Sequence, residues 1–249
     1  MNRRHIVWIA AVSALIAFHG CKDSHQGAHW GYSGEGAPAQ WGSLSKEYAF
    51  CGTGKNQSPI DISKAVKKNL PAITFTYQDV PLMIENNGHT IKVSTSGGGS
   101  ITVDGKKYNL VQLHFHEPSE HTVNGKAAAM VVHLVHQSDD GKLAVVGVLM
   151  EKGAENPLIK SIWNVLPMTV GKPEVHSVRI SASKLLPVKH TYYSYEGSLT
   201  TPPCSEGVKW MVLKQPLTVS AAQIEKYRSL YPGSVRPVQP LNGRVVYSN

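Results

Sequence analysis

Cysteine is scarce in this chain of 249 residues, which contains only Cys21, Cys51 and Cys204. Structural zinc sites built on sulfur need closely spaced cysteine pairs, and this spacing excludes them. If Cys21 is removed or lipidated after export, Cys51–Cys204 is the one internal bridge that remains, and an oxidising compartment would favour it. Two free buried thiols are the alternative that the sequence leaves open.

Long hydrophobic runs are equally scarce. The longest, Ile6–Phe18, has 13 residues and follows the basic residues Arg3 and Arg4, whereas a membrane-spanning helix needs about 20 residues. A basic start followed by a short apolar run is typical of a signal peptide. We therefore predict a signal peptide over residues 1–20, with a cut site that the sequence does not fix, export to the periplasm, and no transmembrane span. Lipid anchoring at Cys21 is the less favoured alternative.

Basic clusters are missing as well, although the chain is basic overall. It has 25 lysines and arginines against 17 acidic residues, a formal net charge of +8. These charges are spread along the chain and are not interleaved with aromatic residues, which make up only 8% of it. That distribution argues against a nucleic-acid partner and suits solubility or the attraction of small anions. A homodimer remains compatible with the sequence.

Helix signals are few and strand signals are many. Only Asn156-Pro157 and the pair Ser220 and Gln223 have the chemistry of helix starts. The predicted strands are Ala72–Tyr77, Leu82–Glu85, His89–Ser94, Ser100–Val103, Lys106–His116, Lys126–His136, Leu143–Met150, Ser177–Ile180, Thr191–Glu196 and Lys209–Lys214. Short Asn- and Gly-containing turns separate many of them, which implies antiparallel pairing.

These patterns predict an α+β fold dominated by sheet. We expect a single domain over residues 21–249, built around a large, mostly antiparallel twisted β-sheet with a few short peripheral helices. Residues 22–72 and 231–249 carry no regular pattern, and we expect them to wrap the sheet edges.

Three histidines are spaced as metal ligands on a hairpin would be. His114 and His116 flank Phe115 on one predicted strand, so their side chains share a face. His133 lies on the next predicted strand, and Asn124-Gly125 between them is the strongest hairpin-turn signal in the chain. If those two residues form the turn, paired residue numbers sum to 249. His133 then lies opposite His116, with Cβ atoms about 5 Å apart.

Such a cluster suits one Zn²⁺ ion. Three neutral imidazoles, each about 2.0–2.1 Å from the ion, leave its charge uncompensated and lower the pKa of a bound water to about 7. The ion then holds a hydroxide near neutral pH without a separate general base. Packed or exposed histidines are the alternative interpretation, and the paired spacing argues against it.

Several motifs follow one another along most of the chain. They are Trp30-Gly31-Tyr32, Asn56-Gln57-Ser58-Pro59-Ile60-Asp61-Ile62, Asn86-Asn87-Gly88-His89, Gln112-Leu113-His114-Phe115-His116, Ser119-Glu120-His121-Thr122, His133-Leu134-Val135-His136, Gly197-Ser198-Leu199-Thr200-Thr201-Pro202-Pro203-Cys204 and Arg236-Pro237-Val238-Gln239-Pro240-Leu241. In this order the motifs resemble the α-class carbonic anhydrases, in their exported bacterial branch. The resemblance implies a zinc enzyme that reversibly hydrates CO₂ to bicarbonate and a proton, with zinc hydroxide as nucleophile and a side activity on activated esters.

The resemblance also implies residue roles around the metal. His114, His116 and His133 look like the zinc ligands, in agreement with the hairpin argument. Thr200 and Glu120 are similar to the family's orienting pair. A threonine hydroxyl that donates to an ionised carboxylate can only accept a hydrogen bond from the group on the metal.

Further roles concern the proton and the substrate. His89 resembles the family's proton shuttle, and histidine suits this because its unperturbed pKa is about 6.5. Residues similar to the apolar substrate pocket and to groups that hold substrate or bicarbonate are Val135, Val145, Leu199, Trp210, Thr200 and Thr201. Gln112 matches the hydrogen-bond partner of His114, and Cys51–Cys204 would match the family's disulfide.

Two positions depart from the family pattern. Val131 stands where the family often has a glutamate bonded to the third zinc histidine, and losing such a partner typically costs 10–100-fold in metal affinity or activity. Lys92 occupies a cavity-lining position that is usually an uncharged amide, and its charge would disfavour protonated His89. A catalytically weak or inactive carbonic anhydrase-like binding module is the alternative function, and the intact histidine triad argues against it. No His-Glu-x-x-His motif supports a zinc protease.

Overall fold

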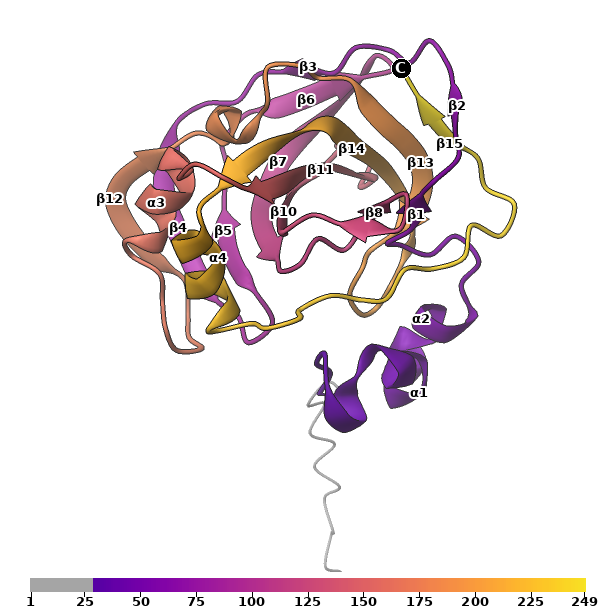
Figure 1. Ribbon diagram of the computed structural model, residues 1–249, viewed down its shortest axis with the longest axis horizontal. Helices are drawn as coiled ribbons and strands as arrows, with labels where there is room; N and C mark the ends of the chain where they lie inside the picture. The colour runs from indigo at the N-terminus through magenta and orange to yellow at the C-terminus, as the bar shows by residue number, and fades with distance from the viewer. Residues whose placement is uncertain (1–28) are drawn as a thin grey trace, which may run out of the picture.

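The computed structural model describes residues 29–249 (Figure 1). The predicted signal peptide and Cys21 lie outside the described residues. Within the described part of the chain, no helix combines the length and apolarity needed to cross a membrane.

One sheet of 12 strands dominates the fold, in the order β12-β4-β5-β7-β10-β11-β14-β13-β15-β2, with β6 also paired to β7 and β3 to β6. Its strands are β2 (Ala65–Lys67), β3 (Thr74–Phe75), β4 (Val80–Asn86), β5 (Ile91–Ser94), β6 (Ser100–Val103), β7 (Lys106–His116), β10 (Met130–Gln137), β11 (Leu143–Lys152), β12 (Glu174–Ile180), β13 (Tyr192–Ser198), β14 (Glu206–Val219) and β15 (Val246–Ser248). A small second sheet joins β1 (Asp61–Ile62), β8 (Thr122–Val123) and β9 (Lys126–Ala127). The predicted sheet-dominated α+β fold is confirmed.

Most neighbouring strands of the large sheet are antiparallel, as predicted. The exceptions are the pairs β11 with β14 and β15 with β2, which are parallel. A long connection separates β11 from β14, and it holds α3 (Pro157–Trp163), β12, a 3₁₀ turn over Ala182–Leu185, and β13. Long connections of this kind permit the parallel pairing that two-residue turns exclude.

Both predicted helices form, and each has the expected cap. The Asn156 side chain accepts hydrogen bonds from the Leu158 and Ile159 N–H groups at the start of α3. Ser220 and Gln223 form a complete capping box at α4 (Ala221–Arg228). The two helices lie together over one side of the sheet (Figure 1), where their apolar residues join the larger core.

The stretches predicted to be irregular contain short elements instead. Residues 22–72 hold 3₁₀ turns over Gly34–Gly36, Pro38–Gln40 and Lys46–Tyr48, the helices α1 (Trp41–Leu44) and α2 (Phe50–Thr53), and strands β1 and β2; residues 231–249 hold β15. Figure 1 shows α1 and α2 outside the sheet, whereas β2 and β15 extend its edge. These segments therefore cover and also lengthen the sheet, and elements this short leave too little periodicity in the sequence to be predicted.

The two faces of the central strands belong to different clusters. Leu113 and Phe115 of β7, with Leu134 of β10, belong to the larger hydrophobic core. Val131 and Val135 of β10 belong to a smaller cluster on the opposite face. Side chains alternate along a strand, so His114, His116 and His133 lie on the face of this smaller cluster.

The predicted pairing of His133 with His116 is wrong by two residues. His133 is the partner of His114, and His116 faces Val131. Next to the turn, Thr122 still pairs with Ala127 as the sum of 249 requires.

Two extra residues cause this shift in register. The Ser119 N–H bonds the Ala128 carbonyl at 3.0 Å, so Glu120 and His121 lie between the two paired regions with no counterpart on the facing segment. A shift of two keeps every side chain on its predicted face. The three histidines therefore still converge, and the extra residues bring Glu120 beside them.

Candidate metal centre

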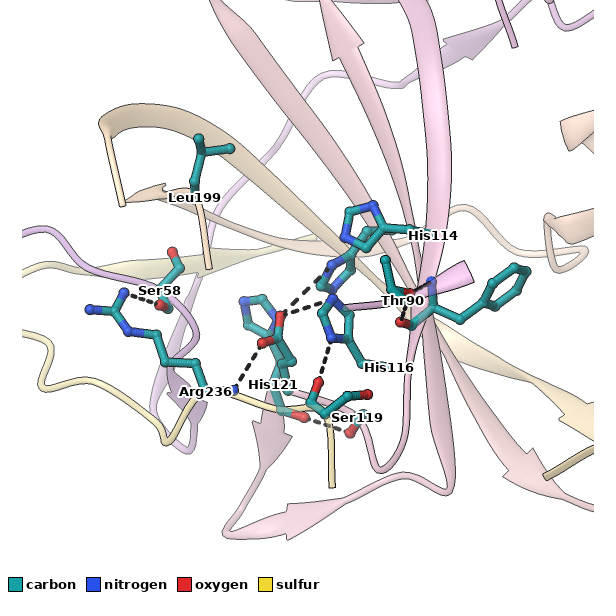
Figure 2. A network of polar contacts seen from close by, with 12 residues as sticks. Ser58, Thr90, His114, His116, Ser119, His121, Leu199 and Arg236 are labelled. Atoms are coloured by element: carbon teal, nitrogen blue, oxygen red, sulfur yellow. Dashed lines mark hydrogen bonds and ion pairs between the residues drawn. The ribbon is translucent and has the colours of Figure 1, made fainter. Parts of the chain in front are cut away.

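Three histidine side chains from two adjacent strands converge on one point. His114 and His116 of β7 and His133 of β10 each offer one ring nitrogen, and these nitrogens all lie within 4.8 Å of one another. His116 and His133 are each only 1% exposed. Figure 2 shows the rings of His114 and His116 projecting from the same strand.

Hydrogen bonds decide which nitrogen of each ring is available. His114 Nδ1 lies 2.9 Å from Gln112 Oε1, and His116 Nδ1 lies 2.7 Å from the Ser234 carbonyl oxygen. Both rings therefore offer Nε2, and the buried Nε2 of His116 has no hydrogen-bond partner in residues 29–249. Such second contacts fix the tautomer and the orientation of a metal-binding ring.

His133 offers its other nitrogen. Its Nδ1 lies 3.9 Å from Glu120 Oε2, and the same oxygen lies 3.4 Å from His116 Nε2. His133 Nδ1 is therefore on the side of the cluster, and its Nε2 points away.

The surroundings of His114 and His133 favour their neutral forms. Burial, followed by the neighbouring histidines, lowers the pKa of His114 and of His133 well below the ordinary value. Neutral imidazoles are the form that binds metals. Three imidazole donors, including the buried His116 Nε2 that has no hydrogen-bond partner among the described residues, fit one Zn²⁺ ion with an open fourth position.

Glu120 is buried beside the cluster and accepts two hydrogen bonds. Its Oε1 accepts from the Arg236 backbone N–H at 3.1 Å, and its carboxyl group also accepts from the Thr200 hydroxyl. Burial raises the pKa of Glu120, and His116 together with these two hydrogen bonds acts in the opposite direction. Once Thr200 has donated its single proton, only lone pairs remain for any further partner.

His89 lies apart from the three converging histidines, before β5. Its ring stacks on Trp30, with centroids 3.7 Å apart and planes 6° from parallel. The Asn87 side chain accepts from the His89 backbone N–H at 3.0 Å and so shapes the turn. Burial and the nearby His29 lower the pKa of His89.

The expected apolar residues gather in the smaller cluster. Val135, Val145 and Trp210 are buried there, and Leu199 packs against it from the edge. The Trp210 and His133 ring centroids are 4.9 Å apart. Thr201, half-buried in the adjoining loop, accepts a hydrogen bond at its carbonyl from the Cys204 N–H at 2.9 Å.

Cys51 and Cys204 form a disulfide bond, as predicted. It joins α2 to the loop that follows Thr200. The Arg236 guanidinium bonds the Cys51 carbonyl at 2.8 Å, so the same residue contacts both the disulfide segment and Glu120.

Reduction of this disulfide should lower the melting temperature. The bond closes a loop with a sequence separation of 153 residues, and the chain-entropy model gives at most about 5 kcal/mol for so long a loop. We expect the melting temperature to fall by up to roughly 10–20 °C, since 1 kcal/mol corresponds to roughly 2–4 °C at this size. Calorimetry with and without reductant measures the change. The Cys51→Ser/Cys204→Ser variant should be insensitive to reductant, and an unchanged wild-type transition would contradict the prediction.

The structure also shows what surrounds Lys92 and Val131, the two residues that depart from the family pattern. Lys92 forms an ion pair with Glu85 on the neighbouring strand β4 and lies opposite His114 in the sheet. Val131 is fully buried, and its side chain has no polar atom.

Sequence reasoning assigned no role to three groups that support this centre. They are the Ser234 carbonyl, the Arg236 backbone N–H and the Trp30 ring. The first two are backbone groups, which no residue type reveals. The third comes from a segment without periodicity.

Comparison with known proteins agrees with these features. The family model for eukaryotic-type carbonic anhydrase matches residues 36–249. A carbonic anhydrase of Neisseria gonorrhoeae is 46% identical over 97% of this chain and 94% of its own length, and one of Klebsiella pneumoniae is 45% identical over 94% and 96%. The α-carbonic anhydrase of Thermovibrio ammonificans, solved with the inhibitor sulfanilamide, is 50% identical with a TM-score of 0.87, over 89% of this chain and 99% of that one. A family match over most of the chain and relatives covered almost end to end show that this protein belongs to the α-class, or eukaryotic-type, carbonic anhydrase family.

Proposed function

We propose that this protein reversibly hydrates CO₂ to bicarbonate and a proton, at a Zn²⁺ ion held by His114, His116 and His133. The observation that carries the proposal is the set of three ring nitrogens within 4.8 Å of one another. Zinc, when bound, supplies a Lewis acid that lowers the pKa of a coordinated water to about 7. The remaining chemistry is the work of the surrounding residues.

Thr200 and Glu120 would select and orient the nucleophile. Glu120 accepts a hydrogen bond from the Thr200 hydroxyl, so the Thr200 oxygen can only accept from another partner. A group that carries a proton satisfies that oxygen, whereas one without a proton faces it lone pair to lone pair. The Arg236 N–H at 3.1 Å supports this polarity because it occupies another lone pair of Glu120.

The apolar residues beside the centre would receive the substrate. CO₂ is small, linear and uncharged, so an apolar wall suits it better than hydrogen-bond donors do. Val135, Val145, Leu199 and Trp210 belong to one cluster on the histidine face. We assign the Thr200 amide and the Thr201 hydroxyl to holding the substrate or the bicarbonate product.

His89 would carry the released proton to solvent. Its half-buried ring rests on Trp30, and it is outside the ligand set, so the proton would reach it through ordered water. Burial and His29 lower the pKa of His89, so the ring would release its proton to solvent more readily than an exposed histidine does.

Substitution of His89 with Ala should slow turnover in weakly buffered solution. We expect a loss of about 10-fold or more, within the range of one general acid–base group, and partial recovery on addition of imidazole. Stopped-flow CO₂ hydration at several buffer concentrations measures both effects. His176→Ala, a change in edge strand β12, is the matched control and should have no effect. Equal rates for wild type and His89→Ala at every buffer concentration would place the shuttle elsewhere.

We also propose export of the protein to the periplasm, with residues 1–20 as a signal peptide and residues 21–249 as one catalytic domain. The disulfide between Cys51 and Cys204 supports an oxidising compartment. Mass spectrometry of protein from the periplasmic fraction tests the proposal, because it gives the mature N-terminus and shows whether Cys21 carries lipid. An intact N-terminus in the cytoplasmic fraction would contradict it.

A further inference from the structure

Besides the His116 Nε2 assigned to the metal, two buried ring nitrogens near the metal centre lack hydrogen-bond partners within the described residues. They are Nε2 of His133 and Nδ1 of His121. The two rings are perpendicular neighbours, with centroids 6.2 Å apart and planes at 83°. Both contact Trp210, at centroid distances of 4.9 and 4.6 Å. Buried polar groups are nearly always hydrogen-bonded, so these two need a common explanation.

His133 needs an acceptor at this position. Because Nδ1 faces the other two histidines and is the nitrogen available to the metal, the neutral ring carries its proton on Nε2. This N–H is a buried donor. Val131 lies two residues earlier on the same strand face, but its side chain cannot accept a hydrogen bond. Leaving a donor buried and unpaired is unfavourable, because the lost hydrogen bond to water is not replaced.

The His121 ring can supply the acceptor that His133 lacks. Its Nε2 lies 2.6 Å from the Tyr195 hydroxyl, which lies 2.8 Å from Ser58 Oγ. If Nε2–H donates to Tyr195, then Nδ1 of the neutral His121 ring is an acceptor. A centroid distance of 6.2 Å keeps the two ring nitrogens beyond direct hydrogen-bonding distance, so a link between them requires a bridging water molecule with hydrogen bonds of about 2.9 Å.

We propose that one buried water accepts from His133 Nε2–H and donates to His121 Nδ1, which makes His121 a positioning residue for the third metal ligand. Glu120 and His121 are the two extra residues of the shifted hairpin, so one irregularity brings both polar groups to the site. The inference depends on the proposed zinc site.

The test compares zinc release from His121→Phe and from wild type. Phenylalanine keeps an aromatic ring against Trp210 but removes the acceptor, so we expect zinc to be bound about 10-fold more weakly, at the lower end of the effect of losing such a partner. Transfer of zinc to a chromophoric chelator gives the rate and the affinity. Melting curves show whether the variant is folded.

A second substitution distinguishes positioning from a general structural role. Val131→Glu places a carboxylate beside His133, so it should slow zinc release in the wild-type background. In its presence His121→Phe should lose little zinc affinity. Non-additivity of this kind is the signature of a shared interaction. Zinc affinity of His121→Phe within twofold of wild type, or no gain from Val131→Glu in either background, would overturn the inference. A folded wild-type protein that binds no zinc would instead contradict the proposed function, and with it this inference.

Discussion

Substitution of His116 with Ala should leave a folded protein that no longer retains zinc and no longer hydrates CO₂ above the buffer rate. His116 offers a buried Nε2 with no hydrogen-bond partner among the described residues, and its Nδ1 is already held by the Ser234 carbonyl. Removal of a ligand should reduce zinc affinity by more than the 10–100-fold that follows loss of a ligand's hydrogen-bond partner. Metal analysis after gel filtration and stopped-flow hydration measure the two effects.

His190→Ala is the matched control for this experiment. His190 is exposed and packs its ring against Phe75, with centroids 4.8 Å apart, so its loss should change neither zinc content nor rate. Stoichiometric zinc in purified His116→Ala, with activity preserved, would contradict the ligand assignment.

Replacement of Glu120 with Gln should reduce hydration by about 10²–10³-fold, the size of effect seen when one preorganised hydrogen-bonding group is removed. The size of the side chain is nearly unchanged, but the new amide can donate toward Thr200 and reverse the polarity of that hydrogen bond. Zinc content should stay near one ion per chain. The steady-state rate constant and the metal content, measured on the same sample, separate loss of orientation from loss of metal.

Thr200→Val provides the second arm of this test. It removes the hydroxyl from the other side of the same hydrogen bond, so the double variant should be little worse than either single variant. Fully additive losses would show that Glu120 and Thr200 act independently, which the proposed pairing does not allow.

The metal centre was predictable where it depends on side-chain parity and short turns. His114 and His116 share a strand face whatever the register, and a shift by two residues leaves His133 on that face as well. The particular partner of His133 was not predictable from the turn alone, because Glu120 and His121 leave the ladder between the turn and the histidines. Pro118 has no N–H to donate and so signals that the ladder is interrupted, but it does not show by how many residues the register shifts.

Groups supplied by distant chain segments were harder to predict. Ser234 and Arg236 act on the site through backbone atoms, and they follow α4 in a segment without regular structure. Similarly, β1, β2 and β15 are two or three residues long, too short for alternation to be visible. Helices α3 and α4 were predicted because their capping residues form local contacts that the sequence shows directly.

The most direct test of the account is stopped-flow CO₂ hydration by the purified mature protein, with zinc content determined on the same sample before and after a chelator. We predict one zinc ion per chain, a rate that falls in proportion to the zinc removed, and recovery when zinc is returned. Rapid hydration by protein stripped of zinc, or zinc-loaded protein with no hydration activity, would contradict it.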